Sequence, residues 1–282
     1  MPSSRRRPGP AATSFAPPEL PAAAVRRVER QRESGTWSSD LTVCELAAIR
    51  SAGFSPAGQV IGSSVHHVAW RSTGVSLHGP TPVVELPDHS RALYSARRMA
   101  LGRMREEARR LGADGVVAVR LVLRRFDQAP DALEITALGT AIRRWARPLA
   151  SPFLSTVDGQ GFAKLLRAGL VPRAVVLGLS TVHVHTDEPT ELLMRGSSVE
   201  IPLFGAAVER ARSLAMARLA RDAENAHADG CVGSDVALDV WRTPCGLDRE
   251  RDHLLQFTAV ATAVARFAPP SRDVPDAVVI LR

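Results

Sequence analysis

The clearest pattern along this chain is a stripe of apolar, mostly small residues that recurs every three or four positions. Such spacing places the side chains on one face of an α-helix. The other face of the first stretch carries Arg98, Arg105 and Arg109, as expected for the side of a helix that meets solvent. The sequence therefore predicts two long amphipathic helices, over 90–111 and 203–226. Their stripes are Ala96, Ala100, Met104, Ala108 and Leu111, and, 115 residues later, Ala211, Ala215, Leu219, Ala223 and Ala226.

A second pattern, with a period of two, lies downstream of each helix. Alternate residues of a β-strand face the same side, and one side of these segments carries mainly small residues. Because two surfaces of small side chains can approach closely, we expect each helix to pack on this side of its own strand. The small-residue sets are Ile135, Ala137, Gly139 and Ala141, and then Phe257, Ala259, Ala261 and Ala263. The predicted strands cover 59–69, 116–123 and 133–143, and then 174–184, 231–240 and 255–265.

These matching elements belong to an internal repeat. Three separated blocks recur at nearly constant offsets of 115 to 122 residues, which is difficult to obtain by chance. The blocks are Val60-Ile61-Gly62 with Val176-Leu177-Gly178, Ala113-Asp114-Gly115 with Ala228-Asp229-Gly230, and Thr136-Ala137-Leu138 with Thr258-Ala259-Val260.

The repeat predicts an α+β protein of two tandem two-layer βαββ units. Each unit is expected to have a three-stranded, mainly antiparallel sheet with one long helix packed on it and a short leading helix. Thr42 and Glu45 fit a capping box at the start of the first short helix, and Asp158 can cap the second. The predicted regions are a disordered Pro/Arg-rich arm (1–36), the first unit (37–144), a linker (145–153), the second unit (154–267) and a C-terminal tail (268–282).

Composition and charge narrow the possible functions. The apolar fraction of 45% is typical of a globular protein, and no apolar run approaches the roughly 18 residues that would span a membrane. The net charge is +7, but residues 1–35 hold seven Arg and three Glu, so the other 247 residues carry only +3. We therefore expect no broad basic face for nucleic acid, except for weak binding through the N-terminal arm.

The cysteines argue against a disulfide framework. Cys44, Cys231 and Cys245 are odd in number, far apart and in no CxxC pair, and the repeat places Val116 where the second unit has Cys231. We interpret them as structural or incidental. The absence of a recognisable export signal and of a disulfide pattern predicts a cytoplasmic protein.

The repeated segments resemble the YbjQ-like family, also called UPF0145 or the heavy-metal-binding domain family. The first unit carries the match most clearly, and the second, from Ala211 to Val264, fits more loosely. The resemblance implies small βαββ subunits that assemble into rings, and therefore a homo-oligomer. One departure is Gly58-Gln59-Val60-Ile61-Gly62 where the shorter members have Gly-Val-Val-Thr-Gly. The matching residues are Ala96-Arg97-Arg98-Met99-Ala100, Leu111-Gly112-Ala113-Asp114-Gly115 and Thr136-Ala137-Leu138-Gly139-Thr140.

Histidines on the strands are the candidate metal ligands. His183 and His185 are two residues apart on a predicted strand, so both imidazoles face one side, where Asp187 would continue the set. His67 occupies the position of His183 in the first unit. Imidazole ligands suit a divalent transition metal such as Zn, Ni or Cu. The alternative is that these are partly exposed strand histidines that bond to neighbouring backbone.

Asp114 and Asp229 each precede a glycine between a helix and a strand, where an aspartate can bond local backbone N–H groups in a tight turn. The sequence contains no P-loop, no GxGxxG motif after a strand, no HExxH and no GxSxG. We therefore expect a non-enzymatic, oligomeric binding protein that binds a heavy metal through His67, His183 and His185. The alternative is a protein-interaction module without metal, whose basic arm recruits an acidic partner or nucleic acid.

Overall fold

The structure is a computed structural model that describes residues 19–67, 82–126, 129–144, 149, 151–186, 188–196, 199–245 and 248–267. We call 19–144 the first half and 149–267 the second half. The first half contains α1 (Ala22–Ser34), α2 (Val43–Ser51), β1 (Phe54–His67), β2 (Val83–Glu85), α3 (Pro87–Arg110), β3 (Gly115–Phe126) and β4 (Ala129–Arg144). The second half contains β5 (Phe153–Leu154), α4 (Gly159–Arg167), β6 (Leu170–His185), α5 (Glu188–Gly196), α6 (Pro202–Asn225), β7 (Gly230–Cys245) and β8 (Asp248–Arg266).

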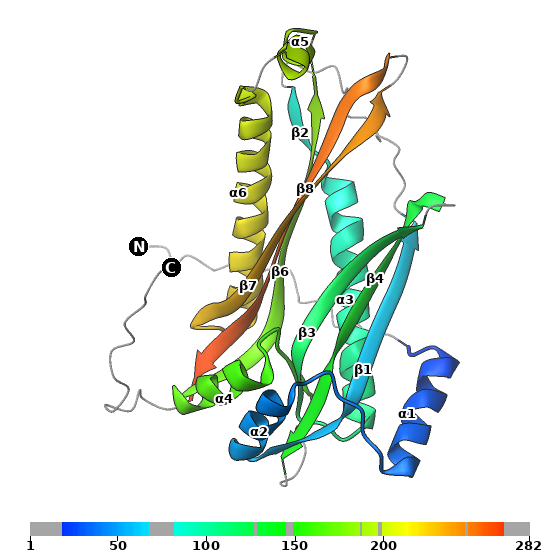
Figure 1. The fold of residues 1–282 in the computed structure, drawn as a ribbon, viewed down its shortest axis with the longest axis vertical. Helices are drawn as coiled ribbons and strands as arrows, with labels where there is room; N and C mark the ends of the chain where they lie inside the picture. The colour runs from blue at the N-terminus through cyan, green and yellow to red at the C-terminus, as the bar shows by residue number, and fades with distance from the viewer. Residues whose placement is uncertain are drawn as a thin grey trace, which may run out of the picture.

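The described strands form two sheets, which Figure 1 shows side by side. The first sheet has the order β1-β4-β3-β5 and the second the order β2-β6-β8-β7. The pairing of β3 with β5 is parallel, and the other pairings are antiparallel. The α+β class predicted from the sequence is confirmed. Each sheet has four strands rather than the three expected, because a short strand is added to each.

The two added strands are exchanged between the halves. Val83–Glu85 precede α3 in the chain, yet they pair with Val182–Val184 of β6 in the second sheet. In the opposite direction, Phe153 and Leu154 pair with the start of β3 in the first sheet. Unpaired edge strands are unfavourable unless something covers them. The exchange covers an edge of each sheet and ties the halves together, which the repeat pattern did not predict.

The alanine stripes of α3 and α6 are buried against the sheets. Ala96 and Ala100 share a core with Ala137 and Ala141 of β4, and Ala211 shares one with three alanines of β8. The packing partners predicted from the two periodicities are therefore correct. This burial removes the apolar stripes from water, which is the main favourable term in such packing.

A very close helix–sheet contact, however, lies on β1 and β6, the first long strand of each half. A Cβ atom added to Gly62 would lie only 1.9 Å from the carbonyl oxygen of Ala100. At Gly178 the corresponding distance, to the carbonyl oxygen of Ala215, would be 2.1 Å. A side chain larger than hydrogen cannot fit at either position, so glycine sets the distance between each helix and its strand.

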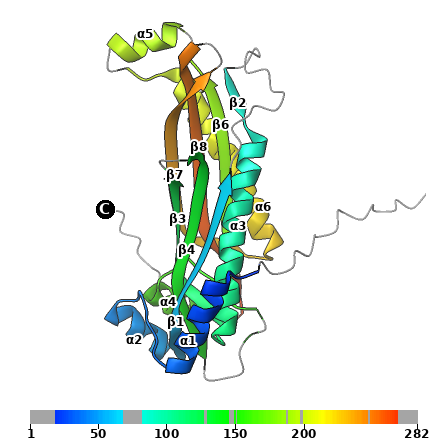
Figure 2. The same cartoon turned by 90° about the vertical axis from the view of Figure 1, so that its right-hand side faces the viewer.

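The core of the first half continues into the second sheet. Val175, Leu177 and Val260 pack into the same cluster as Val116 and Val119 of β3. The helix α3 lies against β1 and also contacts β6. A separate apolar cluster includes Ile49 of α2 and Phe162 of α4, and Figure 2 shows these two short helices together near one end of the molecule. The two halves are thus joined by side-chain packing as well as by strand exchange.

Residues 22–34 differ from the sequence prediction of a disordered arm. They form α1, whose Val28 is 2% exposed within the core of the first half. Arg27 forms a salt bridge with the buried carboxylate of Glu107 on α3. The prolines that suggested disorder all precede the helix, and the last, Pro21, occupies its N-cap position, where a proline is tolerated. The predictions for residues 1–18 and for the whole tail (268–282) lie outside the described residues.

The predicted starts of the two short helices are confirmed. The Thr42 side chain accepts a hydrogen bond from the Glu45 backbone, and the Glu45 carboxylate accepts one from Thr42, which completes the capping box. Burial raises the pKa of Glu45, but its hydrogen bonds with Thr42 outweigh that effect and lower the pKa overall. Asp158 caps α4 by accepting from the backbone of Gly161 at 2.6 Å.

Candidate functional site

A cluster of two histidines and an aspartate lies on the second sheet, at the end where β6 finishes and β8 begins. His183 and His185 face the same side of β6, as their spacing predicts, and His185 lies directly opposite Asp252 in the register of β6 and β8. The Asp252 carboxylate contacts both rings, with His183 Nε2 at 2.9 Å from one oxygen and His185 Nδ1 at 2.6 Å from the other. We call these three residues the histidine–aspartate cluster.

The cluster is largely shielded from water. The side chains of Asp252 and His183 are 1% and 5% exposed, while His185 is 34% exposed and therefore provides the side open to solvent. A buried carboxylate requires compensating partners, and here two imidazoles provide them. Neighbouring His253 faces the other side of β8, edge-on to the ring of Phe204 on α6. Burial lowers the pKa of His253, and the charge of Arg242 acts in the same direction.

The first-half histidines do not join this cluster. His67 is exposed on β1, opposite Ala132 of the first sheet, so it lies on a different sheet from His183 and His185. Its neighbour His66 has a buried Nε2 atom without a hydrogen-bond partner among the described residues. Asp187, the acid expected to continue the set, lies outside the described residues. The sequence therefore predicted correctly that His183 and His185 share one side of β6, while their role as metal ligands stays a prediction. It missed Asp252, whose position opposite His185 depends on strand register.

The donor chemistry of the cluster suits a metal such as zinc, nickel or copper, since two imidazoles and a carboxylate can all act as ligands. In the present geometry His185 Nδ1 is hydrogen-bonded to one Asp252 oxygen, while His183 Nε2 lies 2.9 Å from the other oxygen as a close contact. Within the part of the chain that the structure describes, no group of three His, Cys, Asp or Glu side chains is arranged to hold a metal ion. A metal would therefore have to replace the contacts that Asp252 makes with the two rings.

The cysteines are not part of this cluster. Cys44 and Cys231 are free and exposed, and burial raises the pKa of the Cys231 thiol. Cys44 lies in the first turn of α2, whereas Cys231 is on β7, paired with Ala263. Cys245 ends β7, and its side chain lies outside the described residues.

Asp114 and Asp229 have the turn role predicted for them, but their partners are distant in sequence. Asp114 is 1% exposed and accepts hydrogen bonds from the backbone of Arg144 at 2.7 Å and of Leu149 at 2.9 Å. Asp229 accepts one from the backbone of Arg266 at 2.7 Å. Each aspartate thus fixes the end of the last strand of its sheet rather than a local turn alone.

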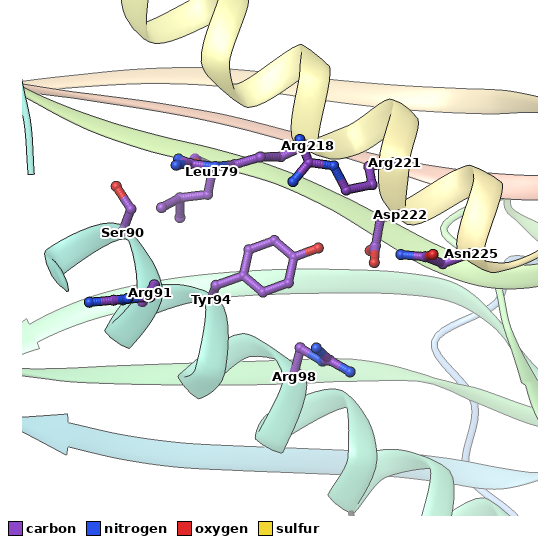
Figure 3. A pocket seen from close by; sticks show the side chains of 9 residues that line it. All are labelled: Ser90, Arg91, Tyr94, Arg98, Leu179, Arg218, Arg221, Asp222 and Asn225. Carbon is purple, nitrogen blue, oxygen red and sulfur yellow. The ribbon is translucent and has the colours of Figure 1, made fainter. Parts of the chain in front are cut away.

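A polar groove of about 240 Å³ lies between α3 and α6, beside Leu179 of β6. Figure 3 shows Tyr94 of α3 directed toward Asp222 of α6, with Arg98 and Arg221 nearby. The Tyr94 hydroxyl donates to the carbonyl oxygen of Leu177 at 3.0 Å. The main cause of its raised pKa is burial, to which the Asp222 carboxylate adds, so the pKa lies well above the usual range. This groove is the polar part of the junction between the two halves.

Comparison with known proteins places the chain in a family. Residues 81–144, which include β2, α3, β3 and β4, match the family model YbjQ_1, described as "Putative heavy-metal-binding". An encapsulin nanocompartment protein of Mycobacterium tuberculosis is 34% identical over 240 residues, which cover 82% of this chain and 86% of the relative. A UPF0145 protein of Thermus thermophilus is 48% identical over 59 residues, or 21% of this chain and 50% of the relative. No helix in the described part of the chain is long and apolar enough to cross a membrane.

Proposed function

This chain belongs to the YbjQ-like (UPF0145) family, and we propose that it is a non-enzymatic binding protein that assembles into a closed homo-oligomeric ring and binds a divalent transition metal. The halves would be two copies of one βαββ unit. The order β1-β4-β3 in the first sheet corresponds to β6-β8-β7 in the second, which supports this equivalence.

The observation that carries the proposed assembly is a difference between equivalent residues of the two halves. Leu121 and Leu123 of β3 are half-buried at the junction with the second half. Their counterparts on β7, 115 residues later, are Val236 and Leu238, which are 52% and 43% exposed. Val240 continues this apolar row and is 51% exposed. A second copy whose first half approaches β7 would bury the row.

The contact between the two halves of one chain could be repeated between successive chains. It joins one surface of the first half to a different surface of the second half, and such a head-to-tail contact builds rings when the rotation closes. The mycobacterial relative is named as an encapsulin nanocompartment protein, a name that describes an assembly. Both points support self-association of this chain.

The proposed metal ligands are His183, His185 and Asp252. The proximity of Asp252 to both imidazoles supports this choice, because three donors of suitable chemistry lie within reach of one another, and the rings and the carboxylate would have to separate to admit the ion. The metal would supply charge to balance the buried carboxylate, and the chain would supply a fixed pair of imidazoles on a strand. His67, which the sequence analysis added to this set, is on the first sheet and is not proposed as a ligand of the same ion.

The metal proposal can be tested by calorimetric titration of the metal-free protein with Zn²⁺ and Ni²⁺. We expect about one ion per chain, and a loss of affinity of at least tenfold in His185→Ala and Asp252→Asn. His67→Ala is the matched control and should bind as the wild type does. Binding that survives both cluster substitutions would overturn the ligand assignment, and no binding by the wild type would favour a protein-interaction module without metal.

A further inference from the structure

The segment just before each long helix reveals how copies of the chain would contact one another. Val84-Glu85-Leu86-Pro87 precedes and begins α3, and Val199-Glu200-Ile201-Pro202 has the corresponding position at α6, 115 residues later. In the first half this segment includes β2, whose Val84 pairs with His183 of β6. In the second half the described residues 199–201 form no strand, and Val199 is 50% exposed.

The strand that would accept this second segment is β1, whose outer edge has no strand paired to it among the described residues. β1 is the equivalent of β6, and it is an edge strand of the first sheet among the described strands. On β6 the outer edge at Thr181 receives a hydrogen bond from the Leu86 backbone at 2.9 Å. The counterpart of Thr181 on β1 is Val65, 116 residues earlier, which is 60% exposed. Among the described residues, one chain thus contains both an unpaired segment of this kind and a sheet edge with no strand paired to it.

The two cannot meet within one molecule. Figure 1 shows the start of α6 on one side of the molecule and β1 on the other. An edge strand with unpaired N–H and C=O groups is a template for pairing with another chain. A second copy is the occupant that fits, because the equivalent segment, β2, already pairs with the equivalent edge, on β6, inside each molecule.

A salt bridge accompanies the pairing of β2 with β6, and residues equivalent to both of its partners are present at the proposed contact. Glu85 of β2 lies 2.6 Å from Arg218 of α6. The counterpart of Glu85 is Glu200, which is exposed, and the counterpart of Arg218 is Arg103 on α3. The two arginines are placed alike, since Arg103 donates to the Ser63 carbonyl at 2.6 Å and Arg218 donates to the Leu179 carbonyl at 2.7 Å.

We propose that Val199–Ile201 of one copy adds as a short antiparallel strand to the edge of β1 in the next copy, with Glu200 paired to Arg103. This inference rests on the proposed homo-oligomer and specifies the contact between neighbouring copies. The internal register places Val199 opposite His67 and Glu200 opposite His66, and it directs the Ile201 N–H to the Val65 carbonyl.

The helix α1 lies over part of this docking edge. Arg27 of α1 contacts Glu107, which is the residue equivalent to Asp222. Arg27 therefore lies beside Glu107 as Tyr94 of α3 lies beside Asp222. If a second copy docks, its α6 would occupy the position beside Glu107 that α1 now fills, starting from the second turn of that helix. Docking of a second copy therefore requires α1 to move aside, which makes α1 a cover for the edge.

The test is a charge exchange in the full-length protein, with the association state measured by sedimentation velocity over a concentration series. Glu200→Arg and Arg103→Glu should each weaken association at least tenfold, and the double variant should recover association to within about threefold of the wild type. Glu224→Arg, an exposed substitution further along α6, is the matched control and should change nothing. Thermal unfolding of each variant checks that the fold is retained, and Glu200 makes no described contact whose loss would unfold the chain.

The outcomes separate this inference from the proposed assembly. If the wild type remains monomeric at every concentration, the proposed assembly fails. If the wild type assembles and Glu200→Arg assembles equally well, only the strand-addition contact is overturned. Weakening in the single variants without recovery in the double variant would also overturn the proposed pairing of Glu200 with Arg103.

Discussion

Glu107 and Asp222 hold equivalent positions, and each fastens its helix to the edge of the strand beneath it. The Glu107 carboxylate accepts a hydrogen bond from the Ile61 backbone at 2.8 Å, and the Asp222 carboxylate accepts one from the Leu177 backbone at 3.1 Å. The two halves differ in what approaches these acids. In the first half it is Arg27 of α1, and in the second it is Tyr94 from the other half of the chain.

Substitution of Gly62 should reveal how tightly the first helix is packed. Gly62→Ala places a methyl group against the Ala100 carbonyl, so we expect the free energy of unfolding to fall by about 1–3 kcal/mol as helix and strand separate. The same should hold for Gly178→Ala. Urea denaturation measures the change. Gly230→Ala is the control, because its added Cβ would have no atom within 4 Å. Equal stability of the three variants would contradict the packing described.

Loosening α1 should promote association. Arg27→Glu replaces the partner of Glu107 by a like charge, so α1 should detach and expose the edge of β1. We expect stability to fall, because a buried carboxylate loses its cation, and association to strengthen by about tenfold, because the cover is removed. Limited proteolysis near residues 22–34 and sedimentation velocity measure the two effects. Arg26→Glu, one position away and exposed, should leave both unchanged; weaker association in Arg27→Glu would show that α1 helps docking instead.

The single tyrosine of the chain allows a direct test of the junction. Burial, and then the Asp222 carboxylate, raise the pKa of Tyr94 above the value of about 10 expected for an unfolded chain. Above that pH the unfolded chain releases the tyrosine proton while the folded chain keeps it, so stability should fall as pH rises. Ultraviolet titration of the native protein should show ionisation only well above pH 10, with a shift back toward 10 in denaturant. Ionisation of the native protein near pH 10 would mean that Tyr94 is not held at this junction.

Arg97 is a buried cation whose removal should be tolerated. Its residue surface is 5% exposed, and it donates to the Thr258 hydroxyl at 3.3 Å. Burial lowers its pKa to about 10, an effect that the charge of Asp239 partly offsets, so Arg97 remains charged at neutral pH, and no described residue forms a salt bridge with it. Replacing a poorly compensated buried charge by an apolar chain of similar length is often neutral or stabilising. We therefore expect Arg97→Met to leave the free energy of unfolding unchanged or higher by about 1 kcal/mol. Arg98→Met is the exposed control, and a loss of more than about 2 kcal/mol in Arg97→Met alone would contradict this interpretation.

The sequence predicted the parts of the fold that depend on periodicity. The stripe that includes Ala96 and Ala211 identified both long helices, and the small-residue faces of β4 and β8 identified the sheet that each helix covers, since side-chain spacing directly reports which face is buried. The short strands β2 and β5 could not be predicted, because only the relative placement of the two halves decides which edge they cover. The helix α1 was missed for a similar reason, since Val28 and Arg27 are stabilised by contacts with the distant α3.

The candidate site was predicted in part. Spacing alone placed His183 and His185 on one side of a strand, because alternation along a strand is a local property. Asp252 was not predicted, since it is brought to His185 by the register between β6 and β8, nearly 70 residues apart in sequence. His67 was grouped with the cluster because it matches His183 in the repeat, and equivalent positions in two sheets are not neighbours in space.

The mass of the native particle tests the central claim most directly. Native mass spectrometry of the purified full-length protein at micromolar concentration should show one discrete oligomer with a fixed whole number of 30.3 kDa chains, as a closed head-to-tail ring requires. A monomer at all accessible concentrations would contradict the account.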